Sequence, residues 1–276
     1  MQSARAQGGG VGKREEGQGM AYTEDGRYEI STVLSRTFDT IGANFLLFAG
    51  LSLVLSGLPA FAIDWWQASQ IAVDTTDSMA VLRPAVFVPI VIVWLVSIVS
   101  STVLQAALTR ATVQHLSGET PNFARCLKVG LALFLPMIAI SFLLAIGVGV
   151  GFLLLVVPGI ILWLMWSVTV PVYVQEQVGI FEAFGRSREL TSGSRWRIFL
   201  TMLVLVFALW LLAIPVGMLT AAARSAGSAT MLLSVLGAIV SALSSMVMVS
   251  IQACIYVELR DVKEGVAPGD LEAIFA

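Results

Sequence analysis

Few side chains in this sequence are of the types that perform chemistry. The chain of 276 residues holds one histidine, His115, and two distant cysteines, Cys126 and Cys254. A lone histidine without a neighbouring cysteine is not the clustered ligand set that a structural or catalytic metal needs. The sequence also contains no Gly-x-Ser-x-Gly elbow and no glycine-rich phosphate loop with a lysine. We therefore expect no metal, no cofactor and no catalytic residues, and predict that the protein is not an enzyme.

The densest group of charges lies in residues 180–199, IFEAFGRSRELTSGSRWRIF. It follows residues 129–175, which contain no charged side chain. A net charge of −2 gives no basic excess for nucleic acid. A lipid enzyme that uses Glu176, Glu182 and Glu189 is a weaker alternative, because Glu182 stands four residues before Arg186, as in ordinary helix pairs. The arginines of the group are Arg186, Arg188, Arg195 and Arg197.

The composition indicates an integral membrane protein. Hydrophobic residues make up 57% of the chain and charged residues only 12%, with a mean hydropathy of +0.88. A soluble domain has about 25% charged residues. So little charge cannot cover the surface of a water-soluble core of this size, and we predict an all-α membrane protein.

Charge-free segments of about 20 residues are long enough to cross a bilayer as helices. They predict six spans, at about 42–63, 86–108, 129–147, 151–173, 198–220 and 229–257. The glycines of AIGVGVG at 145–151 favour a tight turn between the third and fourth spans, although Gly147-x-x-x-Gly151 also resembles a helix-packing face. The first span is longer than a signal-peptide core and follows a polar leader, so we expect it to remain uncleaved.

The lysines and arginines predict the orientation. With six spans, fourteen of them fall on one side and two, Arg83 and Arg224, on the other. Because basic residues stay in cytoplasmic loops, we expect both termini to face the cytoplasm, in a bacterial inner membrane. Residues 1–26 and 261–276 are predicted to be tails, the first of them disordered, on either side of a membrane domain at 27–260.

Short amphipathic segments precede the first, third and fifth spans. Each contains four consecutive residues in the order apolar, small, arginine, small. The arginines of the three strings are Arg36, Arg125 and Arg186. Their apolar positions recur at helical spacing, with Ile30, Leu34, Phe38 and Ile41 in the first segment, as in helices that lie in the interface plane. The sequence thus predicts a six-span bundle with three interfacial helices on the cytoplasmic face.

The region from Pro158 to Phe199 resembles the bacterial glycerophosphoryl diester phosphodiesterase membrane-domain family and the related YciC-like inner-membrane proteins. The positions that match are Pro158-Gly159-Ile160, Trp166, Pro171, Glu176, Ala183, Arg186-Ser187, Leu190, Gly193, Trp196 and Phe199. The resemblance implies the helical membrane domain alone, because the soluble phosphodiesterase barrel of that family has no counterpart in this sequence. It therefore implies no catalytic residue.

Two functions agree with these patterns. The first is a non-enzymatic role in membrane organisation, in which Arg186, Arg188, Arg195 and Arg197 bind anionic lipid head groups or a membrane protein partner. The second is a transporter or channel for a small neutral or amphiphilic solute. It would use the helix with Pro158 and Pro171 and the amides of Gln105 and Gln252, since polar groups inside a span either bind a substrate or join helices. A cavity that reaches either amide would favour the second function.

Overall fold

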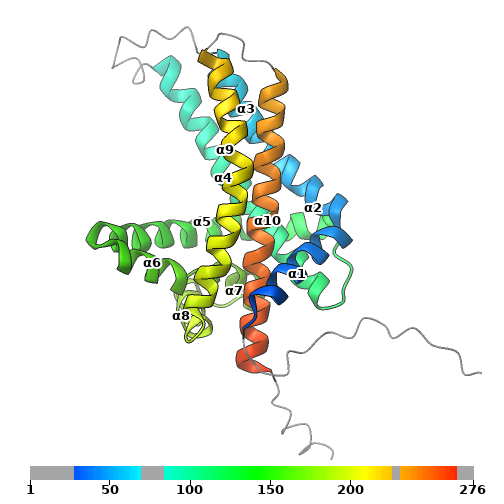
Figure 1. Cartoon of the computed structure of the whole chain (residues 1–276), viewed down its shortest axis with the longest axis vertical. Helices are drawn as coiled ribbons and strands as arrows, with labels where there is room; N and C mark the ends of the chain where they lie inside the picture. Colours follow the sequence, from blue (N-terminus) through cyan, green and yellow to red (C-terminus); the bar gives the residue numbers. More distant parts are fainter. Residues whose placement is uncertain (1–27, 70–83, 226–230, 266–276) are drawn as a thin grey trace, which may run out of the picture.

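The structure is a computed structural model that describes residues 28–69, 84–225 and 231–265. Within these residues every regular element is helical, and none is a strand (Figure 1). The elements are α1 (Ile30–Ala43), α2 (Phe45–Ser52), the π-helical turn η1 (Leu53–Gly57), α3 (Leu58–Ser69), α4 (Pro84–Leu116), α5 (Phe123–Leu154), α6 (Val156–Met165), α7 (Thr169–Glu176), α8 (Ile180–Thr191), α9 (Arg195–Ser225) and α10 (Met231–Glu264).

The predicted all-α membrane fold is confirmed. Six helical segments are long and apolar enough to cross a membrane, so the chain is a multi-pass membrane protein. The predicted tail at 1–26 lies outside the described residues, as do residues 266–276 of the predicted tail at 261–276. Helix α10 continues through Glu264, beyond the predicted end of the membrane domain at residue 260. The six segments are Phe45–Asp64, Phe87–Leu116, Phe123–Leu154, Val156–Glu176, Arg195–Ala223 and Met231–Glu264.

The predicted turn at residues 145–151 is wrong. Helix α5 continues through these glycines, and the chain turns at Leu155, whose backbone is extended. A side chain on Gly147 would overlap the Trp166 ring, and one on Gly151 would come within 2.8 Å of Leu162. The glycines therefore form the face on which α6 packs, which was the alternative interpretation of the same spacing.

Prolines explain where the fourth span begins and why it breaks. Pro158 and Pro171 each lie in the first turn of a helix, α6 and α7, where a missing N–H group costs little. Helix α6 ends at Met165, and α8 covers this end: Ser187 Oγ donates to the Met165 carbonyl at 2.9 Å and Thr191 Oγ1 at 3.3 Å. The predicted interfacial helix at 180–191 is thus bound to the break in its neighbour.

Of the three predicted interfacial helices, two are separate elements, α1 and α8. The remaining one, at residues 123–128, forms the first turns of α5. Asn122 caps the helix there, and the helix then continues without interruption. In α1 the residues that pack against neighbouring helices are only partly those of the predicted apolar face. Val33, Thr37, Thr40 and Ile41 are buried, whereas Phe38 is 57% exposed.

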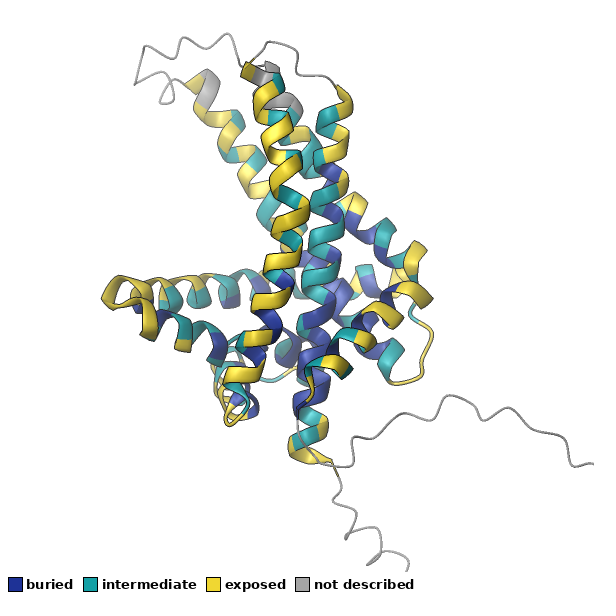
Figure 2. Cartoon of the chain, viewed as in Figure 1, coloured by how far each residue is buried: buried dark blue, intermediate teal, exposed yellow. Residues whose placement is uncertain are grey.

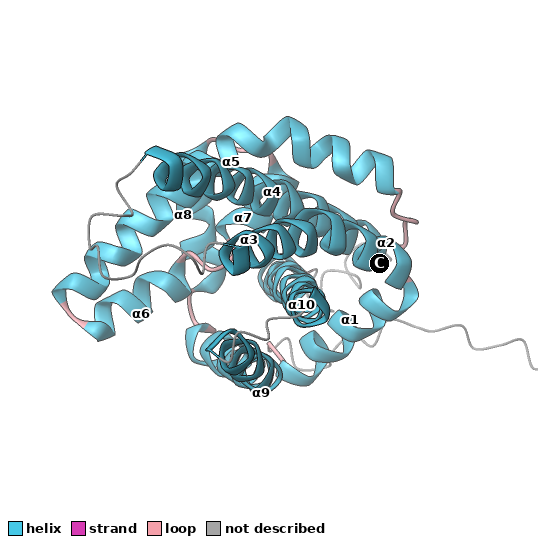
Figure 3. Ribbon diagram, turned by 90° about the horizontal axis from the view of Figure 1, so that it is seen from above, coloured by secondary structure: helices cyan, strands magenta, loops and turns pink. Residues whose placement is uncertain are grey.

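The helices have two directions. Helices α3, α4, α9 and α10 run roughly alongside one another, and the hairpin of α5 and α6 crosses them (Figures 1 and 3). Burial is concentrated near the crossing, where the second half of α10 is enclosed by its neighbours (Figure 2). Elsewhere the long helices expose large apolar side chains, which is expected of surfaces that face lipid.

Candidate functional site

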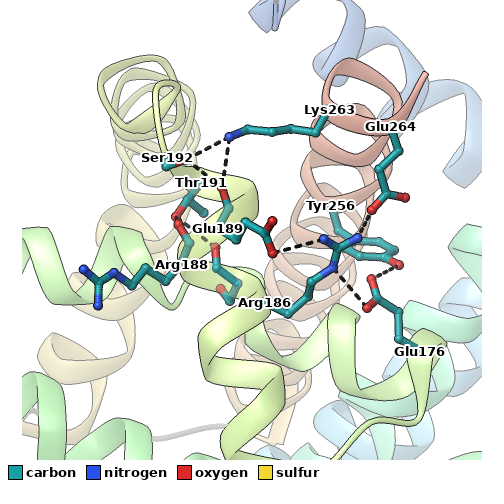
Figure 4. A network of polar contacts seen from close by, with 10 residues as sticks. Glu176, Arg186, Arg188, Glu189, Thr191, Ser192, Tyr256, Lys263 and Glu264 are labelled. Carbon is teal, nitrogen blue, oxygen red and sulfur yellow. Dashed lines mark hydrogen bonds and ion pairs between the residues drawn. The ribbon is translucent and has the colours of Figure 1, made fainter. Parts of the chain in front are cut away.

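Arg186, the first arginine of the predicted basic patch, forms ion pairs with other residues of the protein (Figure 4). Its Nε lies 3.3 Å from Glu176 and its Nη1 3.2 Å from Glu189, and Nη2 pairs with Glu264. Burial disfavours the charged guanidinium, but the hydrogen bonds and charges of Glu189 and Glu176 outweigh it and raise the pKa of Arg186. Arg186 therefore joins α7, α8 and α10.

The same contacts occupy the carboxylates that a lipid enzyme would need. Glu176 accepts a second hydrogen bond, from Tyr256 Oη at 3.0 Å, and Glu182 accepts the backbone N–H of Gly179 at 3.3 Å. Glu189 pairs with Arg186. Within the described residues, no three histidine, cysteine, aspartate or glutamate side chains group as a metal site.

The remaining arginines do not form one patch with Arg186. Arg188 is exposed and points away from the ion-pair cluster (Figure 4). Arg197 Nη1 donates to the Tyr28 carbonyl at 2.8 Å and so holds the start of α1 against α9. Arg195 is half-buried, and its Nε has no hydrogen-bond partner among the described residues. The sequence grouped four arginines that the fold separates into structural and outward-facing ones.

A cavity of about 980 Å³ lies among η1, α3, α4, α5 and α10. Ligand pockets for drug-sized molecules usually measure about 300–1,000 Å³, so this volume admits a whole small molecule. Both amides that the sequence singled out, Gln105 and Gln252, are on its wall. The other polar residues of the wall are serines and one threonine: Ser56, Ser97, Ser101, Thr102, Ser141, Ser241, Ser244 and Ser245.

A second, smaller cavity of about 170 Å³ adjoins the first. It lies against the break between α6 and α7, where Trp163, Trp166 and Ser167 line it. Three residues line both cavities, one each from α4, α5 and α10: Gln105, Ser141 and Gln252. The two amides and this hydroxyl thus stand at the junction between a wide chamber and a narrow one.

Hydrogen bonding distinguishes these three residues, together with Ser244, from the other polar residues of the wall. Most wall hydroxyls have partners nearby: Ser97 Oγ donates to the Val93 carbonyl at 2.8 Å, and Ser56 and Ser245 hydroxyls lie 2.8 Å apart. In contrast, no described residue forms a hydrogen bond with the side chain of Gln105, Ser141 or Gln252. A primary amide has two N–H donors and one acceptor oxygen, and leaving such groups unpaired away from water costs about 1–3 kcal/mol. Their natural partners are a ligand or water in the cavity.

The cavity is uncharged and opens sideways. None of the described residues that line either chamber is ionisable. Trp94 and Phe142 line the large chamber and are 63% and 64% exposed on the outer surface of α4 and α5. That surface is apolar, and so is most of the chamber wall, in which the hydroxyls and the two amides are set.

Local backbone features create the chamber. The π-helical turn η1 places Ser56 against α10, with its hydroxyl 3.2 Å from that of Ser241. Such turns occur frequently at functional sites. A side chain on Gly130 would come within 2.6 Å of the Val103 carbonyl, so glycine permits α5 to cross α4 closely. Neither the π-turn nor the crossing has a clear signal in the sequence, and Ser141 was missed for that reason.

Comparison of the chain with protein-family models, curated proteins and solved structures finds no match. The family resemblance of residues 158–199 therefore stays a prediction.

Proposed function

We propose that the protein is a binding protein or transporter for an uncharged amphiphilic molecule. The observation that supports this most directly is the meeting of three unpaired polar side chains, Gln105, Ser141 and Gln252, where the two chambers join. Side chains that only joined helices would have been paired with one another or with backbone. Here they face a space that is large enough for a ligand.

The chemistry of the wall favours a neutral ligand. A phosphate or carboxylate without a cationic partner is costly to remove from water, and no described wall residue supplies a positive charge. Hydroxyl, carbonyl and amide groups of a ligand match the serines and glutamines in the wall, and apolar groups match the rest of it. The apolar entrance at Trp94 and Phe142 favours a molecule that arrives from the bilayer, such as a lipid with a hydroxyl head group.

The distribution of lysine and arginine supports a location in the bacterial inner membrane with both termini in the cytoplasm. In this orientation, the narrow chamber and the ion-pair cluster of Arg186 lie toward the cytoplasmic side. A solute bound at the amides would then be near the cytoplasmic end of the four aligned helices.

A second candidate function is membrane organisation through α8 and the start of α9. Phe181 is 79% exposed and Trp196 is 83% exposed, and the exposed, outward-facing Arg188 is close to them in sequence. Exposed aromatic and basic side chains of this kind suit a surface with anionic lipid head groups or a membrane protein partner. Arg186 is left out of this candidate function because it is bound to three carboxylates.

Photo-crosslinking in nanodiscs tests the first proposal. The full chain is irradiated with photoreactive diacylglycerol or with photoreactive phosphatidylglycerol of the same acyl chains, and the labelled peptides are mapped. We expect diacylglycerol to label residues around Phe142 and the label to fall strongly in Gln105→Leu/Gln252→Leu. Thr220→Val, a polar-to-apolar change on α9 outside the cavity, serves as the control. Equal labelling by both lipids, unchanged in the double variant, would refute the proposal.

A further inference from the structure

The hairpin of α5 and α6 crosses the aligned helices near one of their ends. Both views show α5 running across the direction of the aligned helices, and the one it packs against is α4 (Figures 1 and 3). The place of contact on α4 is given by Gly130, which lies against the Val103 carbonyl, and by Met137 and Ile140, which share a buried cluster with Ala106. The crossing therefore lies at residues 103–107 of α4.

Charged residues give the depth of this crossing. Arg110, whose Nη1 donates to Gln175 at 2.9 Å, stands four residues beyond Ala106 and seven beyond Val103. At 1.5 Å per residue these are separations of about 6 and 10 Å along the helix. Half of the hydrocarbon core is about 15 Å thick. If Arg110 marks the edge of the hydrocarbon, the hairpin lies within a single leaflet.

Helix α10 gives the same depth independently. Gln252 lines the small cavity together with Trp163 and Trp166 of the hairpin. It precedes Glu258, which pairs with Arg36 at 3.0 Å, by six residues, or about 9 Å. In the other direction α4 extends from Val103 back to Phe87, about 24 Å further. The hairpin is thus near one end of the aligned helices and far from the other.

The surface of the hairpin matches acyl chains and not head groups. Residues 129–175 contain no charge, and the tip exposes Leu153 by 87%, Leu154 by 71% and Leu155 by 68%. Leu135, in the first half of α5, is 68% exposed as well. A helix in the head-group region needs one strongly polar face, which this hairpin lacks.

We propose that α5 and α6 lie along one leaflet, the one next to Arg110 and Glu258, with lipid acyl chains as their partner. The segment Phe45–Asp64 and helices α4, α9 and α10 then cross the bilayer. All six segments are long enough to cross, and a hairpin returns the chain to the side from which it started whether or not it crosses. The lysine and arginine count is therefore the same for both paths. This inference does not depend on what the cavity binds.

Cysteine accessibility in the full chain tests the path of the hairpin. Leu154→Cys places a thiol at the exposed tip, and the two native cysteines remain because both are fully buried. Ser225→Cys, at the far end of α9, and Thr120→Cys, in the loop before α5, are the controls for the two sides. A membrane-impermeant maleimide is applied to bacterial cells before and after permeabilisation, and a nitroxide on the tip thiol reports its depth.

With the hairpin in one leaflet, Leu154→Cys is labelled at least about tenfold less than Ser225→Cys in intact cells, because a thiol in hydrocarbon does not ionise. The nitroxide then lies on the Thr120→Cys side of the bilayer centre. Labelling of Leu154→Cys in intact cells to the level of Ser225→Cys overturns the proposal. The proposal is also overturned if the Leu154→Cys thiol is protected from the maleimide but its nitroxide lies on the Ser225→Cys side of the bilayer centre. Leu154 packs against little, so its replacement leaves the fold in place, and unchanged labelling of the native cysteines verifies this.

Discussion

Replacing the two cavity glutamines by leucine should weaken ligand binding without destabilising the protein. Gln105 and Gln252 have no hydrogen-bond partner among the described residues, so Gln105→Leu/Gln252→Leu removes no internal bond. If each amide contributes a net 0.5–1.5 kcal/mol to a bound ligand, as is typical, the double variant loses about 1–3 kcal/mol. This corresponds to binding that is roughly 5- to 150-fold weaker.

The double variant should be as stable as the parent protein or slightly more stable. An unpaired amide in an apolar space costs about 1–3 kcal/mol, but both glutamines are half-buried, and water in the cavity reduces this cost. We therefore expect at most about 1 kcal/mol of stabilisation per site, which raises Tm by roughly 2–4 °C in a chain of this size. Amides that held helices together would instead lower Tm when replaced.

Gln175→Leu is the matched control. Its Oε1 accepts a hydrogen bond from Arg110 at 2.9 Å, so the same substitution there removes a real contact and should lower Tm. Thermal unfolding of the full chain in nanodiscs, followed by tryptophan fluorescence with and without diacylglycerol, measures both effects. The reasoning is refuted if the double variant loses more stability than Gln175→Leu, or if diacylglycerol stabilises the double variant as much as the parent protein.

Two further predictions concern the framework around the cavity. Arg186→Gln leaves three carboxylates without their cation, so we expect it to lower the free energy of unfolding by about 1–3 kcal/mol. Replacement of the exposed arginine in Arg188→Gln should change it by less than about 0.5 kcal/mol. Equal unfolding temperatures for the two variants would contradict the ion-pair cluster. Gly147→Ala forces a methyl group into Trp166 and should destabilise the α5–α6 hairpin by about 1–3 kcal/mol. In Gly149→Ala the methyl group meets open space, so this control should be neutral or slightly stabilising. Hydrogen exchange of the α6 backbone amides measures both effects.

The sequence predicted those features that depend on composition and on local spacing. Low charge and long apolar runs are sufficient for a six-helix membrane fold, since a bilayer requires each span to satisfy its own backbone. The spacing of charged and apolar residues also located α8. Gln105 and Gln252 stood out because amides are rare within apolar segments, and the structure places both on the wall of the cavity.

The incorrect predictions involve packing between distant segments. The pattern AIGVGVG permits either a turn or a close helix contact, and only the position of Trp166, directly after α6, decides between them. The arginines of residues 180–199 are neighbours in sequence, yet one of the three carboxylates that pair with Arg186, Glu264, is at the end of α10. No local pattern in the sequence contains either contact.

The crossed arrangement of helices also explains why a cavity exists at all. Helices that run side by side interdigitate along their length and leave few voids, whereas a helix that crosses others touches each one over a short segment. Here Gly130 brings α5 close to α4 at the crossing, but further along α5 Ser141 and Phe142 line open space. Apolar side chains could have filled this wedge, yet its wall holds serines and two amides. A wedge that is left open, with unpaired polar groups in a largely apolar wall, carries a stability cost that is typical of a binding site rather than of a packing defect.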